Sequence, residues 1–151
     1  MTRILVLNGP NLASLGRREP ERYGTATFGE LVARLGRHAD ELGLTLRCEQ
    51  SNHEGVLVDL LEEEAGRSAG VVVNPGGLGH TSVVLRDAYA AFPGPVVEVH
   101  ITNVHAREPF RHVAVTAGAA TGMIAGLGQD GYLLALEALR RLLGGTTEDP
   151  A

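Results

Sequence analysis

The chain has 151 residues, a formal net charge of −5 and 44% hydrophobic residues, which suits one domain over residues 1–151 with a real core. All thirteen basic residues are arginines. The absence of lysine excludes a lysine Schiff base, a lysine general base and a Walker-type phosphate site. The acidic balance comes without a basic stripe, so we expect no nucleic-acid partner.

Nothing in the sequence is typical of an exported or membrane-spanning chain. The N-terminus leads straight into an apolar strand, and no apolar run approaches ~20 residues. A single cysteine, Cys48, excludes an internal disulfide framework and a thiolate-cluster metal site. We therefore expect a cytoplasmic protein that has no membrane partner.

Apolar runs alternate with segments of helical periodicity along the chain. Strands are predicted near residues 3–8, 45–50, 70–74, 96–101 and 121–125. Helices are predicted from Thr27, with Glu30 completing a capping box, to Gly43, and over about 54–65, 80–92 and 129–143, before a frayed polar tail at 146–151. This alternation predicts an α/β fold with a flavodoxin-like five-stranded parallel sheet, order 2-1-3-4-5, and helices on both faces.

The loop after the first strand is far longer than the usual two to six residues and predicts a lid or a binding loop. It carries Arg18 and Tyr23, five residues apart. A phenol ordinarily loses its proton near pH 10, so a base role near neutrality needs a cation that favours the phenolate. An ordinary surface loop with a salt-bridging arginine is the alternative.

Two further polar clusters follow the third and fourth strands. Neighbouring parallel strands end at one edge of the sheet, so these clusters should share a pocket with the first loop. Asn11 and Asn74 are candidate donors to an oxyanion or to substrate hydroxyls, although asparagines in turns commonly cap backbone groups.

His100 ends the fourth strand, and Glu98 lies on the same strand face, where it could orient the imidazole for proton donation. A hydrogen-bonded core histidine is the alternative. His80 is predicted to open the third helix, where an anion is favoured, and Arg111 could clamp a carboxylate. A metal site from His100, His105 and His112 lacks a standard ligand spacing, so we expect no metal.

The stretch from Gly126 to Gly131 matches G-x-G-x-x-G between a strand and a helix. A dinucleotide site would need a following strand and an acidic residue about 20 positions later. The chain ends instead, so a tight turn into the last helix is favoured and no cofactor is expected.

Several ordered motifs together resemble the type II 3-dehydroquinate dehydratase family over about residues 4–140. They are Leu7-Asn-Gly-Pro-Asn-Leu12, Arg18-Glu-Pro with Tyr23-Gly24, Gln50-Ser-Asn-His-Glu-Gly55, Asn74-Pro-Gly76, His80-Thr-Ser-Val83 with Arg86-Asp87, and Glu98-Val-His100 followed by Asn103 to Arg111. The resemblance implies conversion of 3-dehydroquinate to 3-dehydroshikimate and water through an enolate, without a Schiff base, metal or other cofactor.

The resemblance also implies roles for individual residues. Tyr23 would remove the C2 proton, with Arg18 making the phenol easier to deprotonate on a mobile lid. Asn11 would stabilise the enolate, and His100, supported by Glu98, would protonate the departing C1 hydroxyl. The substrate-binding positions implied are Asn74, Gly76, His80, Ile101, Thr102 and Arg111, with Asp87 reaching a neighbouring subunit in a dodecamer built as a tetramer of trimers.

A non-catalytic flavodoxin-like ligand-binding or regulatory domain is the rival interpretation. A flavin carrier would need ring-stacking aromatics, which are few here, and a phosphoacceptor domain would need acidic residues after the first strand. The chain departs from the family at Ala13, Thr102 and Gly77-Leu78-Gly79, and these departures leave the proposed catalytic groups in place.

Overall fold

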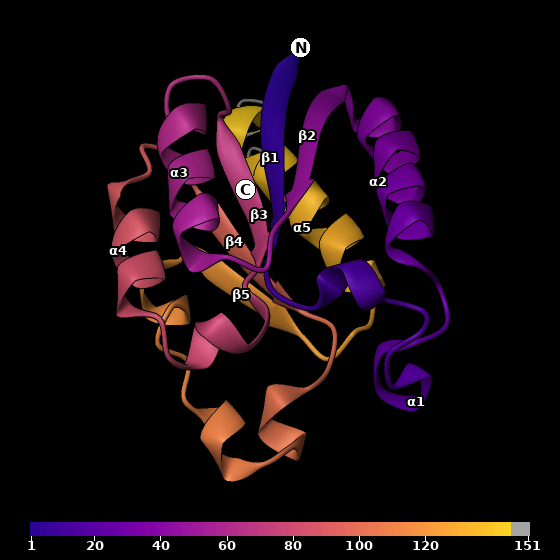
Figure 1. Ribbon diagram of the computed structural model, residues 1–151. Helices are drawn as coiled ribbons and strands as arrows, with labels where there is room; N and C mark the ends of the chain where they lie inside the picture. The colour runs from indigo at the N-terminus through magenta and orange to yellow at the C-terminus, as the bar shows by residue number, and fades with distance from the viewer. Residues whose placement is uncertain (146–151) are drawn as a thin grey trace.

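A five-stranded, all-parallel sheet forms the centre of the computed structural model, which describes residues 1–145 (Figure 1). The strand order is β2-β1-β3-β4-β5, as predicted. The strands are β1 (Thr2–Asn8), β2 (Leu44–Gln50), β3 (Gly70–Asn74), β4 (Val96–His100) and β5 (Gly122–Ala125). The tail at 146–151, predicted to fray, lies outside the described residues.

Within the described residues, five α-helices lie in the connections between the strands or cover the sheet. They are α1 (Pro20–Tyr23), α2 (Phe28–Leu42), α3 (Glu54–Glu64), α4 (Val83–Ala91) and α5 (Asp130–Arg140). The predicted capping box is present: the Thr27 hydroxyl accepts a hydrogen bond from the Glu30 backbone N–H, and the Glu30 carboxylate accepts one from Thr27.

The prediction that a helix starts at His80 is wrong. Residues Gly76–His80 form a 3₁₀ turn, and α4 starts only after Ser82, whose hydroxyl accepts a hydrogen bond from the Leu85 N–H. Ser82 is the better N-cap because its side chain satisfies a free backbone donor of the first turn, which His80 cannot do.

Side chains of each buried strand alternate between two cores. On β1, Ile4 and Val6 pack with α2 and α5, whereas Leu5 and Leu7 pack with α3 and α4. Figure 1 shows these two helix pairs on opposite sides of the sheet. All four side chains are fully buried, and each burial contributes about 1.5–3 kcal/mol. Strands held this firmly fix the position of the loops that leave their carboxyl ends.

Two long connections gather at the carboxyl edge of the sheet, at the lower end of the molecule in Figure 1. The first follows β1 and contains α1, and the second joins β4 to β5 through short 3₁₀ turns. The glycine-rich stretch after β5 is the tight turn that we favoured: Gly126 and Gly128 have φ of +88° and +63°, and their N–H groups bond to carbonyls at the end of β4. No helix within residues 1–145 is long and apolar enough to cross a membrane.

Candidate active site

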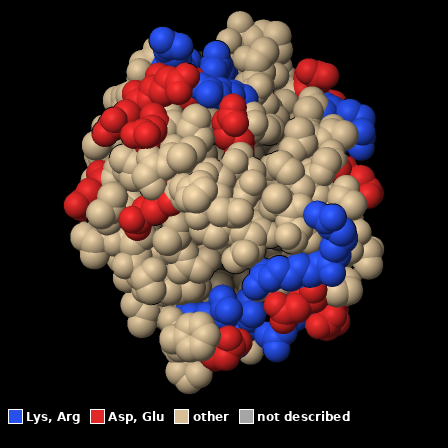
Figure 2. Space-filling model, in the orientation of Figure 1, with Lys and Arg blue, Asp and Glu red and all other residues tan. Residues whose placement is uncertain are grey.

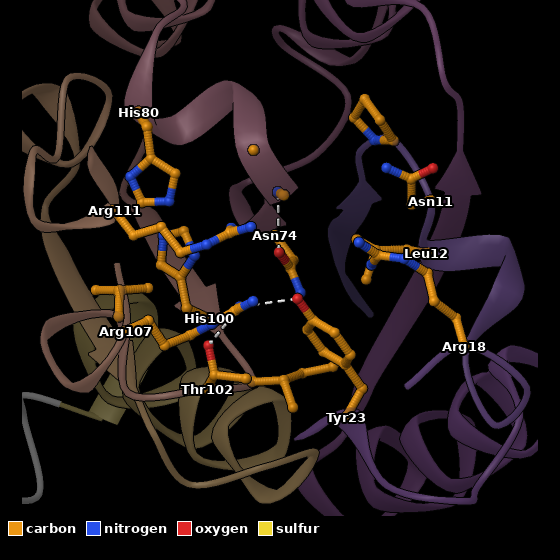
Figure 3. Close-up of a pocket in the computed structure, with 15 residues that line it drawn as sticks. Asn11, Leu12, Arg18, Tyr23, Asn74, His80, His100, Thr102, Arg107 and Arg111 are labelled. Atoms are coloured by element: carbon orange, nitrogen blue, oxygen red, sulfur yellow. Dashed lines mark hydrogen bonds between the residues drawn. The ribbon is translucent and has the colours of Figure 1, made fainter. Parts of the chain in front are cut away.

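A pocket opens at the carboxyl edge of the sheet, where the three predicted polar clusters meet (Figure 3). Its lining combines residues from the loops after β1, β3 and β4: Pro10, Asn11, Leu12, Arg18, Tyr23, Asn74, Gly76, Gly77, His80, His100, Ile101, Thr102, Val104, Arg107 and Arg111. Three arginines and no carboxylate belong to this set, within the part of the chain described. The pocket therefore suits an anionic ligand.

Arginine side chains also gather outside the pocket at the same end of the molecule, around α1, where they are interspersed with acidic ones (Figure 2). One ion pair there joins the two long connections, with Arg22 Nη1 3.8 Å from Glu108 Oε1. Glu108 in turn accepts a 3.0 Å hydrogen bond from Arg111, which is the main reason that the pKa of Glu108 is lowered. The carboxylate stays ionised and holds α1 against the opposite wall of the pocket.

Tyr23 projects from α1 into the pocket, between two guanidinium groups. Arg107 Nη1 donates a 2.8 Å hydrogen bond to the Tyr23 hydroxyl oxygen, and the guanidinium carbons of Arg18 and Arg107 lie 5.1 and 5.4 Å from the ring centroid. Two positive charges at these distances would stabilise negative charge that develops on the Tyr23 oxygen.

Sequence analysis did not single out Arg107 as a site residue. Its side chain is 10% exposed and also donates to the Thr102 hydroxyl at 3.3 Å. It lies 84 positions from Tyr23, so no local spacing could connect the two residues. The available signal was its place in the polar segment after β4.

The predicted pair of His100 and Glu98 forms at the end of β4. His100 Nε2 is 2.8 Å from Glu98 Oε2, and both side chains are buried. The Glu98 carboxylate can accept a hydrogen bond from Nε2–H, and the other ring nitrogen, Nδ1, forms no hydrogen bond within residues 1–145. The geometry fixes the orientation of the His100 ring through Glu98.

His80 lies beside His100 rather than at a helix start. The two rings stack with centroids 6.0 Å apart, and His80 Nδ1 is 2.7 Å from the Val113 carbonyl. The turn before it approaches closely: a Cβ on Gly79 would lie 2.9 Å from the Pro75 ring and 3.3 Å from the His100 ring. Glycine at 79 allows this wall of the pocket to reach the imidazole.

Asn74 is held from below by a residue that sequence analysis did not find. Its Nδ2 donates to the hydroxyl of Tyr132 at 2.9 Å, its Oδ1 accepts from the Gly76 N–H, and the Tyr132 hydroxyl donates to Asn8 at 2.7 Å. Burial raises the pKa of Tyr132 well above its ordinary value, so this hydroxyl keeps its proton. The network fixes the orientation of the Asn74 amide at the floor of the pocket.

Asn11 adopts the left-handed conformation, with φ of 72°. The Asn52 side-chain oxygen accepts hydrogen bonds from the Asn11 backbone N–H at 3.0 Å and from Gln50 Nε2 at 3.1 Å. Asparagine tolerates this conformation better than most residues. The motif that starts at Gln50 therefore helps to position Asn11 in the lining of the pocket.

The remaining candidates divide into two groups. Ile101, Thr102 and Arg111 line the pocket as expected. Asp87 does not: it is exposed on α4, beside a groove between α3 and α4. His105 and His112 pack together with ring centroids 5.8 Å apart, away from His100, and no group of three or more His, Cys, Asp or Glu within residues 1–145 could hold a metal ion.

The fold and the pocket together define a flavodoxin-like α/β protein whose pocket, at the carboxyl edge of its sheet, contains a tyrosine between arginines and a buried histidine–carboxylate pair. The family model for dehydroquinase class II matches residues 2–140. A 3-dehydroquinate dehydratase of Roseiflexus castenholzii is 54% identical over 137 residues, which cover 91% of this chain and 87% of that protein. The chain belongs to the class II dehydroquinase family, and it is an enzyme.

Other relatives agree. A protein of Aspergillus clavatus named catabolic 3-dehydroquinase is 51% identical, with 89% of both chains covered. The crystal structure of type II dehydroquinase from Propionibacterium acnes superposes with a TM-score of 0.90 at 45% identity, covering 93% of this chain and 97% of the other. The predicted family and fold are therefore confirmed.

Proposed function

We propose that this pocket converts 3-dehydroquinate to 3-dehydroshikimate and water by an anti elimination through an enolate. Membership of the class II dehydroquinase family supports the overall reaction, the dehydration of 3-dehydroquinate in the shikimate pathway. One observation carries the mechanism: a phenol flanked by two guanidinium groups shares a pocket with a buried histidine–carboxylate pair.

The first step assigns the base. The Tyr23 phenolate, stabilised by Arg18 and Arg107, takes the C2 proton, and the electron pair moves onto the C3 carbonyl oxygen as an enolate. Asn11, in the lining of the pocket, stabilises this oxygen, directly or through a water molecule. The same positive charges that favour the phenolate attract the anionic substrate.

The second step assigns the acid. The enolate collapses, the C1–oxygen bond breaks, and the imidazolium of His100 gives its proton to the departing hydroxyl, which leaves as water. Glu98 stabilises the imidazolium while the proton is on His100. Asn74, Gly76, His80, Ile101, Thr102 and Arg111 hold the hydroxyl groups and the carboxylate of the substrate.

This route needs neither a Schiff base nor a metal. The sequence contains no lysine, so no lysine imine can form with the C3 ketone. A side chain of each required type, base, acid and oxyanion donor, already lines the pocket. We accordingly propose no cofactor.

The position of Asp87 supports an oligomeric enzyme. Its exposed carboxylate lies beside a largely apolar groove between α3 and α4, outside its own pocket. We propose that Asp87 reaches the pocket of a neighbouring subunit in a dodecamer of four trimers that acts in the cytoplasm. Analytical ultracentrifugation should give twelve times the mass of the 15.9 kDa chain; a monomer with full activity contradicts this assembly.

The deciding assay adds 3-dehydroquinate to the purified protein and follows the ultraviolet absorbance of the conjugated enone. Activity should survive borohydride with substrate present, because no imine forms. Tyr23→Phe should abolish turnover and leave substrate affinity within about twofold, since only the base is lost. Normal turnover in that variant refutes the base assignment, and no turnover in the wild type favours a non-catalytic binding domain.

A further inference from the structure

Glu98 is a fully buried carboxylate, and within residues 1–145 the one ionisable group of opposite sign beside it is the histidine that it orients. Its side chain is 0% exposed, and no arginine lies within ion-pair distance of it among residues 1–145. A buried carboxylate is costly unless hydrogen bonds replace the lost water. Something other than His100 must therefore stabilise the negative charge.

Two hydroxyl groups from other parts of the fold donate hydrogen bonds to Oε1 of this carboxylate, the oxygen that does not contact His100. Tyr89, on α4, donates to Glu98 Oε1 at 2.9 Å, and Thr116, in the connection from β4 to β5, donates to the same atom. Both residues are buried, at 2% and 0% exposed. The alternative acceptor for the Thr116 hydroxyl, the Gly79 carbonyl, is 3.5 Å away.

The two oxygens of the Glu98 carboxylate have different hydrogen-bond partners. Oε1 accepts both hydroxyl bonds, and Oε2 is left for His100 Nε2 at 2.8 Å. Hydroxyl donors bond better to an ionised carboxylate than to a carboxylic acid, so they favour the charged form. Burial and the charge of Glu98 raise the pKa of Tyr89 well above its ordinary value, so the phenol keeps the proton that it donates.

We propose that Tyr89 and Thr116 are positioning residues that keep Glu98 ionised and its Oε2 directed at His100, so that the acidic proton of the pair resides on the imidazole. This inference rests on the proposed function, in which His100 is the acid. A proton on Glu98 is useless for elimination, because the carboxyl group does not line the pocket. The hydroxyl groups of Tyr89 and Thr116 thus set the fraction of the protonated enzyme in which the proton lies on His100, where it can be given to the substrate.

Other ionisable groups also face the pair and its pocket. The ring of His80 stacks on His100, and the pocket in front of His100 is lined by Arg18, Tyr23, Arg107 and Arg111. The segments that pack against β4 from β3, β5 and α5 bring no charged side chain to Glu98 within hydrogen-bond or ion-pair distance, among residues 1–145. Removing one hydroxyl leaves all these groups in place, so a changed titration reports the hydroxyl itself.

The test removes each hydroxyl while keeping the shape of the side chain. Thr116→Val and Tyr89→Phe preserve packing, and the Thr116 N–H still bonds to the Gly79 carbonyl. Thr116→Ser should restore the function. Thr45→Val is the matched control, because Thr45 is exposed on β2 and its hydroxyl donates a hydrogen bond to the Thr2 carbonyl, far from the pocket.

We expect kcat to fall about tenfold in Thr116→Val and in Tyr89→Phe, a part of the 10²–10⁴ that acid–base catalysis contributes, with KM within about twofold. The alkaline limb of kcat should move up by about one pH unit, because a less stabilised carboxylate binds the proton of the pair more tightly. Thr116→Ser and Thr45→Val should match the wild type.

A second measurement does not depend on turnover. Nitrogen-15 NMR of labelled histidine, with His100 assigned through His100→Gln, should reveal a smaller imidazolium fraction at His100 in Thr116→Val and Tyr89→Phe than in the wild type. An unchanged imidazolium fraction in both variants overturns the proposal, even if the enzyme is active. Absence of dehydratase activity in the wild type instead refutes the proposed function and leaves the NMR result to decide the inference.

Discussion

Two carboxylates are completely buried at opposite edges of the same sheet, and their partners differ in kind. Glu98, at the carboxyl edge, accepts hydrogen bonds from two hydroxyl groups and one histidine. Glu64, at the end of α3, is paired with the guanidinium groups of Arg3 and Arg47 at 2.8 and 2.7 Å. Permanent cations neutralise one charge, and a titratable group faces the other.

This difference suits Glu64 to stabilising the fold and Glu98 to assisting proton transfer. Glu64 connects α3 to β1 and β2 and also accepts a hydrogen bond from Ser68. Its hydrogen-bond partners and its counter-charges therefore do not change with pH near neutrality. The charge of Glu98 is balanced only while His100 is protonated. A buried carboxylate that can gain and lose its counter-charge can assist proton transfer, whereas one between two arginines can only hold elements together.

The largest expected effect comes from neutralising Glu98, the carboxylate that contacts His100. Glu98→Gln should lower kcat by about 10²- to 10⁴-fold, because the amide no longer stabilises the imidazolium of His100. Stability should change little, since the substitution keeps the shape and removes a buried charge. Steady-state kinetics and urea unfolding of the same preparation check both statements; a large loss of stability would make Glu98 a structural residue like Glu64.

Neutralising the other carboxylate should have the opposite result. Glu64→Gln removes the carboxylate that pairs with both Arg3 and Arg47 and should lower the free energy of unfolding by about 1.5–3 kcal/mol, with kcat unchanged where the protein is folded. Glu63→Gln is the matched control: Glu63 also binds Arg47, at 2.9 Å, but is half exposed, so it should cost about 1 kcal/mol or less. Equal losses in the two variants would contradict the comparison.

The arginines extend the same contrast. Arg47 is surrounded by three carboxylates, whereas Arg107 donates to a phenol and a threonine hydroxyl and has one carboxylate, Glu108, at 3.6 Å. Arg107→Gln should lower kcat about 10- to 100-fold and move the rising limb of the pH profile upward, because the phenolate of Tyr23 loses a donor and a positive charge. In Arg111→Gln, which leaves Tyr23 untouched, KM should rise without that movement. If the rising limb of the pH profile does not move in Arg107→Gln, Arg107 does not stabilise the phenolate of Tyr23.

The smallest expected effect is on acid stability. Burial by itself would raise the pKa of Glu64, but the bonds from Ser68 and Arg47 and the charge of Arg3 outweigh it, and the pKa is lowered. Its contribution is therefore complete above the ordinary carboxyl value of about 4.3 and is lost as the pH falls through the lower value of the folded state. The stability gap between wild type and Glu64→Gln should narrow between pH 5 and pH 3. A constant gap contradicts the ionic role of Glu64.

Local patterns in the sequence determined the elements and part of the site. Continuous apolar runs predicted the strands, and Thr27 with Glu30 predicted the start of α2. Positions two apart on a strand share a face, so the sequence predicted that Glu98 lies beside His100. The convergence of the loops followed from the strand order, because parallel strands end at one edge.

Only the tertiary structure decided the contacts that join distant segments. The bond between Arg107 and Tyr23, the hydroxyl of Tyr132 under Asn74, and Thr116 on Glu98 connect residues 84, 58 and 18 positions apart. Each depends on how a loop or helix packs after the sheet has formed. Sequence spacing specifies which side chains share one element, but the packing of one element on another specifies which side chains meet across them.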